Sequence, residues 1–166
     1  MRPLSLPLAF LGIFACLPIG PPGVGAASGL QPSEIYERWG AAVVTVVGTE
    51  SVATGFAIPP RGYVVTNYHV VERQSWLQVL LRTGETRQVS SVIVQDPRRD
   101  LAVLVVSPPL ASTVVLGDSD VTKVGQRVVV IGSPRGLSQT VTDGLLSQIR
   151  TLPDGADIPL LQIQNS

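Results

Sequence analysis

The spacing of apolar and polar positions changes once along the chain, close to Gly40. Before it, residues 33–39 predict a short helix, which Ser33 can cap at its amino end and Gly40 stops. After it, short apolar or alternating runs are separated by turns rich in glycine and proline, a pattern typical of β-strands. These runs cover residues 41–47, 51–58, 63–66, 76–81, 86–94 and 101–106. Short strands joined by short connections predict a closed antiparallel barrel, which leaves no exposed strand edges.

A second group of strands follows an interruption at Pro108-Pro109 and a polar stretch around Ser119. Strand-like runs resume at residues 126–131, 139–149 and 160–163. Three strands cannot close a barrel, so we expect one complete barrel and part of a second. The predicted fold is all-β. The expected divisions are a leader (1–26), an amino-terminal segment with a short helix (27–40), a first barrel (41–107), a linker (108–124) and the start of a second barrel (125–166).

The first 26 residues predict an export signal. Arg2 precedes an apolar stretch at residues 8–17, which is too short to span a bilayer and is ended by Pro18. Small residues around Ala26 suit cleavage by a signal peptidase, so we expect an exported protein, periplasmic or extracellular, with no stable membrane span. Lipid attachment at Cys16 is the alternative, which the bulky Phe14 disfavours.

Composition excludes several classes of protein. The chain has 12 basic and 12 acidic side chains, so it lacks the positive surplus that nucleic-acid binding requires. With 45% hydrophobic and 14% charged residues, it is not a disordered chain. It contains one cysteine and one histidine, too few for a cysteine- or histidine-based metal centre, and we expect neither metal nor cofactor.

Two side chains are candidates for chemistry. His69 follows a predicted strand, where a rigid scaffold can hold a reactive group, although a single histidine is often an ordinary half-buried residue. Asp100 opens the sixth predicted strand and could form a surface pair with Arg98 or Arg99. Alternatively, it accepts a hydrogen bond from Nδ1–H of His69, as in nucleophilic catalysis. Histidine before aspartate within the first barrel is the chymotrypsin order.

Together these features resemble the trypsin-like serine proteases of the HtrA/DegP (Deg) family. The matching segments, in the family's order, are residues 53–58, 62–71, 100–104, 116–120 and 124–144. The resemblance implies two β-barrels with a cleft between them, His69 as general base and Asp100 as its orienting partner. It also implies a polypeptide substrate, with unfolded or damaged exported proteins expected.

Two further expectations rest on the same resemblance. Residues 136–138 and 140–142 would line the substrate side of the second barrel, although ordinary strand and turn roles suit them equally. Family members also form trimers through the segment that matches Ile35, Tyr36 and Trp39. Packing of these side chains onto their own barrel is the alternative.

The serine nucleophile is not assigned within the chain. Ser119 follows Gly-Asp as a trypsin nucleophile does, but Asp120 and Val121 replace the glycines whose backbone N–H groups form an oxyanion hole. Ser133 precedes a proline and is read as a turn residue. In the family, the nucleophile follows shortly after the segment that matches residues 161–166. We therefore expect it beyond Ser166, which no glycine-rich turn follows.

Three functions remain open from the sequence. The first is a serine endopeptidase whose serine lies beyond this chain, so that the chain alone is inactive. The second is an inactive protease-like domain that binds polypeptide without cutting it. The third is an unrelated secreted barrel in which His69 and Asp100 never meet.

Overall fold

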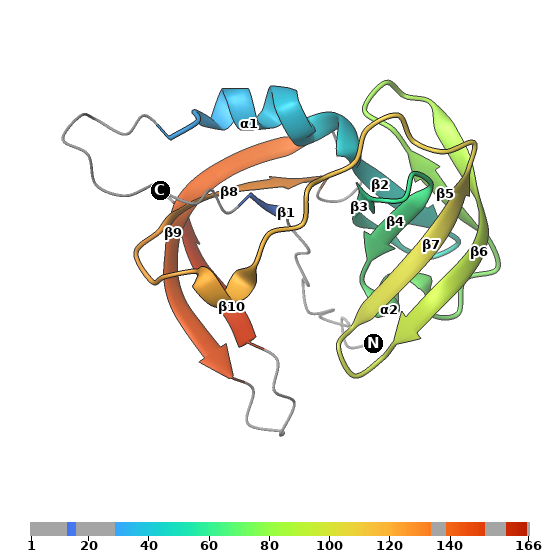
Figure 1. The fold of residues 1–166 in the computed structure, drawn as a ribbon. Helices are drawn as coiled ribbons and strands as arrows, with labels where there is room; N and C mark the ends of the chain where they lie inside the picture. The colour runs from blue at the N-terminus through green and yellow to red at the C-terminus, as the bar shows by residue number, and fades with distance from the viewer. Residues whose placement is uncertain (1–12, 16–28, 134–138, 152–158, 166) are drawn as a thin grey trace, which may run out of the picture.

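Residues 43–107 form a closed six-stranded antiparallel barrel (Figure 1). The computed structural model describes residues 13–15, 29–133, 139–151 and 159–165. The barrel closes in the order β2-β3-β4-β7-β6-β5. Its strands are β2 (Val43–Gly48), β3 (Val52–Ile58), β4 (Tyr63–Thr66), β5 (Leu77–Leu80), β6 (Thr86–Asp96) and β7 (Leu101–Ser107). The predicted closed barrel is confirmed.

The alternation of side chains along β7 shows why these residues form a barrel wall. Ala102, Leu104 and Val106 are buried, while the residues between them are partly exposed, as expected for a strand with one face on a core. On β3, Gly55 allows close packing across the interior. A Cβ there would lie 2.9 Å from Val46 Cγ2 and 3.0 Å from the carbonyl oxygen of Val65.

The segment before the barrel differs in detail from the prediction. Helix α1 (Pro32–Trp39) starts one residue earlier than expected, with proline in its first turn, a position that suits proline. The Glu34 carboxylate accepts a hydrogen bond from the backbone N–H of Gln31 at 2.6 Å, so Ser33 is not the cap. The predicted first strand is also too long, because Gly40–Ala42 form a 3-10 turn, η1, and β2 begins at Val43. Small apolar residues suit either conformation, so the pattern alone could not separate them.

The second unit is an open sheet. Strands β8 (Arg127–Gly132), β9 (Thr140–Thr151) and β10 (Pro159–Asn165) pair as consecutive antiparallel neighbours, in agreement with the predicted partial second barrel. The short strand β1 (Ile13–Ala15) pairs with the other edge of β8. Residues 13–15 belong to the predicted leader, whose removal stays a prediction.

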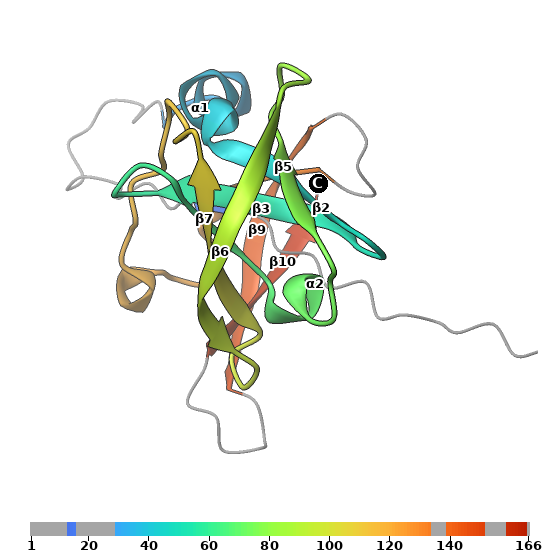
Figure 2. The same cartoon turned by 90° about the vertical axis from the view of Figure 1, so that its right-hand side faces the viewer.

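Contacts made by α1 and by Gln139 help to join the two units. Ile35 of α1 is 1% exposed and lies in one core cluster with Val129 and Ile131 of β8. The Gln139 side-chain amide donates hydrogen bonds to the carbonyl oxygens of Gly40 (3.0 Å) and Val43 (2.7 Å). Figure 1 shows α1 running along the second sheet and leading into β2, and Figure 2 shows the same arrangement from the side of the first barrel.

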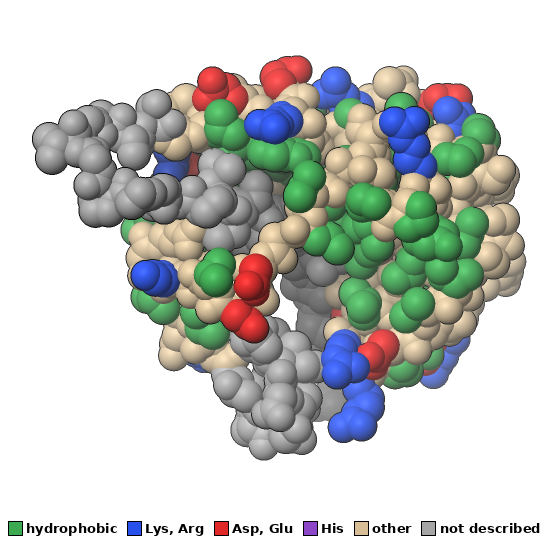
Figure 3. Space-filling view, in the orientation of Figure 1, with side chains coloured by type: hydrophobic (Ala, Val, Ile, Leu, Met, Phe, Trp, Pro, Cys, Tyr) green, Lys and Arg blue, Asp and Glu red, His purple; other side chains and the backbone are tan. Residues whose placement is uncertain are grey.

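The linker, residues 108–124, packs in part against the first barrel. Leu110 and Val114 are buried, and the Val114 N–H donates to the carbonyl oxygen of Ala57 at 2.8 Å. The linker then forms a 3-10 turn, η2 (Ser119–Val121), before β8. On the face seen in Figure 3, apolar side chains gather over the first barrel and charged side chains of both signs are interspersed around them. Among the described residues, no helix combines the length and the hydrophobicity needed to cross a bilayer.

Candidate active site

His69 lies on a one-turn helix, α2 (Tyr68–Val71), immediately after β4. Val70 and Val71 are buried in the barrel core and hold the helix in place. The Ser51 hydroxyl, from the hairpin between β2 and β3, donates to the carbonyl oxygen of Val70 at 2.7 Å. The side chain of His69 faces outward from this fixed turn and is 46% exposed. The sequence indicated only that His69 follows a strand, because a single helical turn has no periodicity to detect.

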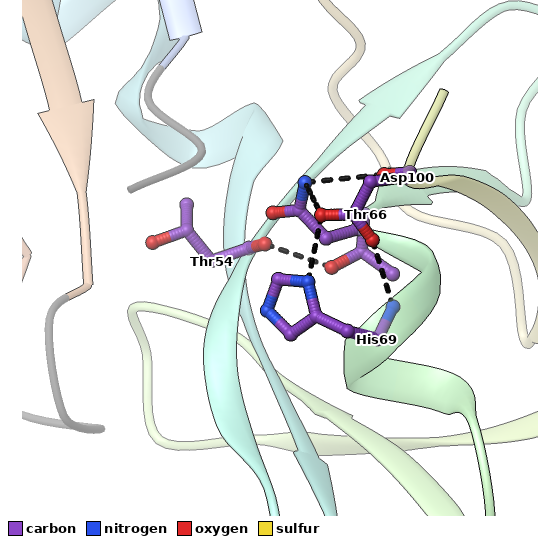
Figure 4. Close-up of polar contacts among 5 residues, drawn as sticks. Thr54, Thr66, His69 and Asp100 are labelled. Atoms are coloured by element: carbon purple, nitrogen blue, oxygen red, sulfur yellow. Dashed lines mark hydrogen bonds and ion pairs between the residues drawn. The ribbon is translucent and has the colours of Figure 1, made fainter. Parts of the chain in front are cut away.

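The structure brings His69 and Asp100 together (Figure 4). Nδ1 of His69 lies 2.7 Å from Oδ2 of Asp100, and the backbone N–H of His69 donates to Oδ1 at 2.9 Å. An ionised carboxylate can only accept hydrogen bonds, so Nδ1 carries the proton of the shorter bond. In the neutral imidazole, the other ring nitrogen, Nε2, then carries a lone pair. This distance contradicts the reading in which the two side chains never meet.

The turn between β6 and β7 places Asp100 next to His69. Asp96 accepts hydrogen bonds from the backbone N–H groups of Arg98 (3.1 Å) and Arg99 (3.0 Å), and from the Arg99 guanidinium at 2.8 Å. The guanidinium bond, followed by the backbone N–H of Arg99, lowers the pKa of the Asp96 carboxyl. Arg99 is thus paired with Asp96, and the alternative surface pair between Asp100 and a neighbouring arginine is absent from the described residues.

Asn67 also contacts Asp100, a contact that sequence reasoning missed. Its side-chain amide lies 3.1 Å from both the carbonyl oxygen and Oδ2 of Asp100. The pairing of β4 with β7, which the sequence pattern does not give, explains this contact. Thr66, the last residue of β4, lies opposite Ala102 in this antiparallel pair, so Asn67, which follows it, comes level with the start of β7.

Buried hydroxyl groups lie behind the histidine. Thr66, which is fully buried, donates through Oγ1 to the carbonyl oxygen of Thr54 at 3.0 Å (Figure 4). The Thr54 hydroxyl accepts in turn from the backbone N–H of Ser133, at 2.9 Å. Because Ser133 follows β8, this pair of bonds links the strand that leads to His69 with the second sheet.

The structure describes two of the three serines considered in the sequence, Ser119 and Ser133. Ser119 is exposed in η2, and both views show this turn apart from α2 (Figures 1 and 2). Ser133 is 2% exposed, with its backbone bound to Thr54. Ser166 lies outside the described residues. Within the described part of the chain, Asp100 is the only hydrogen-bond partner of the His69 ring.

The sequence also suggested residues for contacts with other subunits and with substrate. Ile35 is buried, and Tyr36 and Trp39 are partly buried against the core, so all three pack onto their own molecule. Residues 140 and 141 are exposed on β9, while residues 136–138 lie outside the described part. Among the described residues, no group of three or more His, Cys, Asp and Glu side chains is placed to hold a metal ion.

Comparisons with known proteins point to one family. Residues 53–164 match the family model described as trypsin-like peptidase domain. The chain is 44% identical over 114 residues to a probable periplasmic serine endoprotease, DegP-like, from Halomonas elongata. It is 35% identical over 150 residues to the protein of that name from Ectopseudomonas mendocina. These alignments cover 68% and 85% of the chain, but only 24% and 31% of the relatives.

Solved structures are similar as well. The HtrA-type protease AlgW with a tripeptide has a TM-score of 0.70 and 29% identity, over 77% of this chain and 43% of that protein. The serine endoprotease from Yersinia pestis has a TM-score of 0.63 and 25% identity, over 72% of this chain and 45% of that protein.

Proposed function

Because this chain belongs to the trypsin-like peptidase family, in its HtrA/DegP branch, we propose that it carries the histidine and the aspartate of a serine endopeptidase. The observation that supports this most directly is the 2.7 Å contact between His69 Nδ1 and Asp100 Oδ2. Catalysis of this type needs a base in one tautomer and a carboxylate that holds it there. The chain spans about a quarter of the length of its curated relatives, so the proposal concerns the full-length protein.

In the proposed mechanism, His69 acts first as a general base and then as a general acid. Nε2 takes the proton from a serine hydroxyl while the serine oxygen attacks the peptide carbonyl carbon, and it then gives that proton to the leaving amine. Water hydrolyses the acyl-enzyme by the same steps, and the serine is regenerated. Asp100 remains ionised and stabilises the imidazolium that forms in each half. By the family resemblance, the serine follows the segment that matches residues 161–166, together with the backbone N–H groups that bind the oxyanion.

We further propose that the substrates are unfolded or damaged exported polypeptides. A polypeptide substrate is supported by the relatives, which are named periplasmic serine endoproteases, and by AlgW, whose structure contains a tripeptide. The unfolded or damaged state of the substrate rests on the family resemblance alone. Export of this protein rests on the predicted leader and on the same relatives. Assembly into a trimer remains a prediction.

The test uses the full-length gene product, an unfolded casein substrate and a fluorophosphonate probe that reacts with activated serines. The His69→Ala variant should lose kcat/KM by at least about a thousandfold and should label far more slowly, because the general base is gone. Gln95→Ala, which removes an exposed amide of β6, is the matched control and should retain activity.

Two results would end the proposal. One is a wild-type protein that binds casein but neither cuts it nor reacts with the probe, which would favour the inactive binding domain. The other is a His69→Ala variant that cuts as fast as the wild type.

A further inference from the structure

We propose that Asn67 is a positioning residue, whose amide holds Asp100 in the orientation that receives Nδ1–H of His69. The inference rests on the proposed function for its kinetic consequences, but the contact itself does not. The side-chain NH2 of Asn67 lies 3.1 Å from Oδ2 of Asp100 and 3.1 Å from the carbonyl oxygen of the same residue. An amide has two N–H donors, so both bonds can form at once.

The backbone conformation of Asp100 shows why a hydrogen bond that restrains this residue would be useful. Its φ is +51°, in the left-handed region that residues other than glycine seldom adopt, although aspartate tolerates it better than most. The two oxygens that Asn67 contacts belong to one residue, so their relative position depends on the ψ, χ1 and χ2 angles of Asp100. A single rigid amide that binds both therefore restrains the peptide and the carboxylate together.

The remaining contacts of Asp100 indicate how its carboxylate would move without the Asn67 amide. Oδ1 of Asp100 accepts the backbone N–H of His69 at 2.9 Å, whereas Oδ2 accepts both Nδ1–H and the amide of Asn67. The Asp100 side chain is 40% exposed, so water competes for the same oxygens. With Asn67 removed, the bond at Oδ1 would act as a pivot, and the carboxylate could rotate away from Nδ1. We expect a partial loss of activity.

Asn67 itself is well anchored. It lies between β4 and α2 with extended backbone angles, φ −72° and ψ 148°, and its carbonyl oxygen accepts from the Val70 N–H at 3.3 Å. The residue before it, Thr66, is fully buried and bonded to β3. The amide therefore reaches Asp100 from a fixed support, which a positioning role requires.

Kinetics of the full-length enzyme test the role. Asn67→Ala should lower kcat about 10- to 100-fold, the range expected for losing a hydrogen bond to a charged group, with KM within about twofold of wild type. Asn67→Asp keeps the shape but replaces a donor by a like-charged acceptor, so at pH 8 it should lose at least as much. The exposed Gln95→Ala variant is the control. A fully active Asn67→Asp enzyme would overturn the inference, because packing alone would then explain the side chain.

A double-mutant cycle separates positioning from general damage to the fold. If Asn67 acts through Asp100, then Asn67→Ala should cause no further loss of kcat in an Asp100→Ala background. An additional loss in that background, as large as in the wild type, would contradict the inference.

A readout without catalysis distinguishes this inference from the proposed function. His69 is the only histidine of these 166 residues, and in 15N-histidine-labelled full-length protein its Nδ1–H signal can be assigned by its absence in His69→Gln. Asn67→Ala should shift or broaden that signal, and Gln95→Ala should not. If the wild type neither cuts nor labels but the signal still responds, the positioning role stands and the endopeptidase proposal fails. An unchanged signal in an active enzyme would overturn the positioning role of Asn67 and leave the endopeptidase proposal intact.

Discussion

Three protein donors converge on the carboxylate of Asp100, which nevertheless remains 40% exposed to solvent. An exposed ion pair contributes little to folding, typically about 0–1 kcal/mol. The value of this cluster therefore lies in orientation. It holds one tautomer of His69 with Nε2 available, and this is the state that a general base needs.

The Asp100→Asn variant separates the effect of Asp100 on the tautomer of His69 from its effect on the stability of the fold. The amide keeps the shape, but its NH2 group can donate to Nδ1 and so favour the wrong tautomer of His69. In the full-length protein we expect kcat to fall by about 10⁴-fold, with the midpoint of thermal unfolding almost unchanged. Casein hydrolysis and a thermal scan measure the two effects. Undiminished hydrolysis would show that Asp100 does not orient His69.

At the scale of elements, the turn between β6 and β7 controls where Asp100 lies. Asp96 binds two backbone N–H groups of the turn and the Arg99 side chain, and these bonds direct Arg99 away from Asp100. The folded turn lowers the pKa of the Asp96 carboxyl below its ordinary value of 3.8. This carboxyl therefore binds protons less readily in the folded protein than in the unfolded chain.

That difference predicts a pH dependence of stability. The contribution of the Asp96 charge is complete above the unfolded pKa of 3.8 and is lost as the pH falls through the lower folded pKa. Asp96→Asn keeps an acceptor for the backbone but has no charge to titrate. The stability difference between wild type and variant should therefore shrink as the pH is lowered from about 6 to below 3.8.

Urea unfolding of the full-length protein at several pH values measures this difference. Glu37→Gln removes an exposed carboxylate from α1 and is the control for the loss of one negative charge. A difference between wild type and Asp96→Asn that stays constant with pH would contradict the assignment.

For the whole molecule, the hydrogen bond between Ser133 N–H and the Thr54 hydroxyl is a buried polar link between the two units. Thr54→Val keeps the volume and removes the acceptor of this N–H. We expect the free energy of unfolding to fall by about 1–3 kcal/mol, the cost of removing one partner of a buried hydrogen bond. Thr54→Ser retains the hydroxyl and should lose much less. Equal destabilisation of the two variants in denaturant titrations would assign the effect to packing.

Local features of the chain were sufficient to predict most elements. Strands such as β7 alternate buried and exposed residues, and glycine or proline separates them from their neighbours, so period and turn chemistry locate them. The same local reasoning was wrong at Ser33 and at residues 41–42, where several conformations suit the same residue types. The pairing of His69 with Asp100, which lie 31 positions apart, was predicted from motif and order along the chain.

By itself, the sequence determined that this protein is a β-barrel protein of the trypsin-like type with one histidine and an aspartate suited to it, because period, turns and motifs are short-range properties. Only the tertiary structure decided that Asn67 binds Asp100, that Asp100 has a left-handed backbone, and that Thr54 meets Ser133 across 79 positions. Those contacts depend on how the barrel closes and how the second sheet packs against it. Distances between residues far apart in the chain arise only when the whole core assembles.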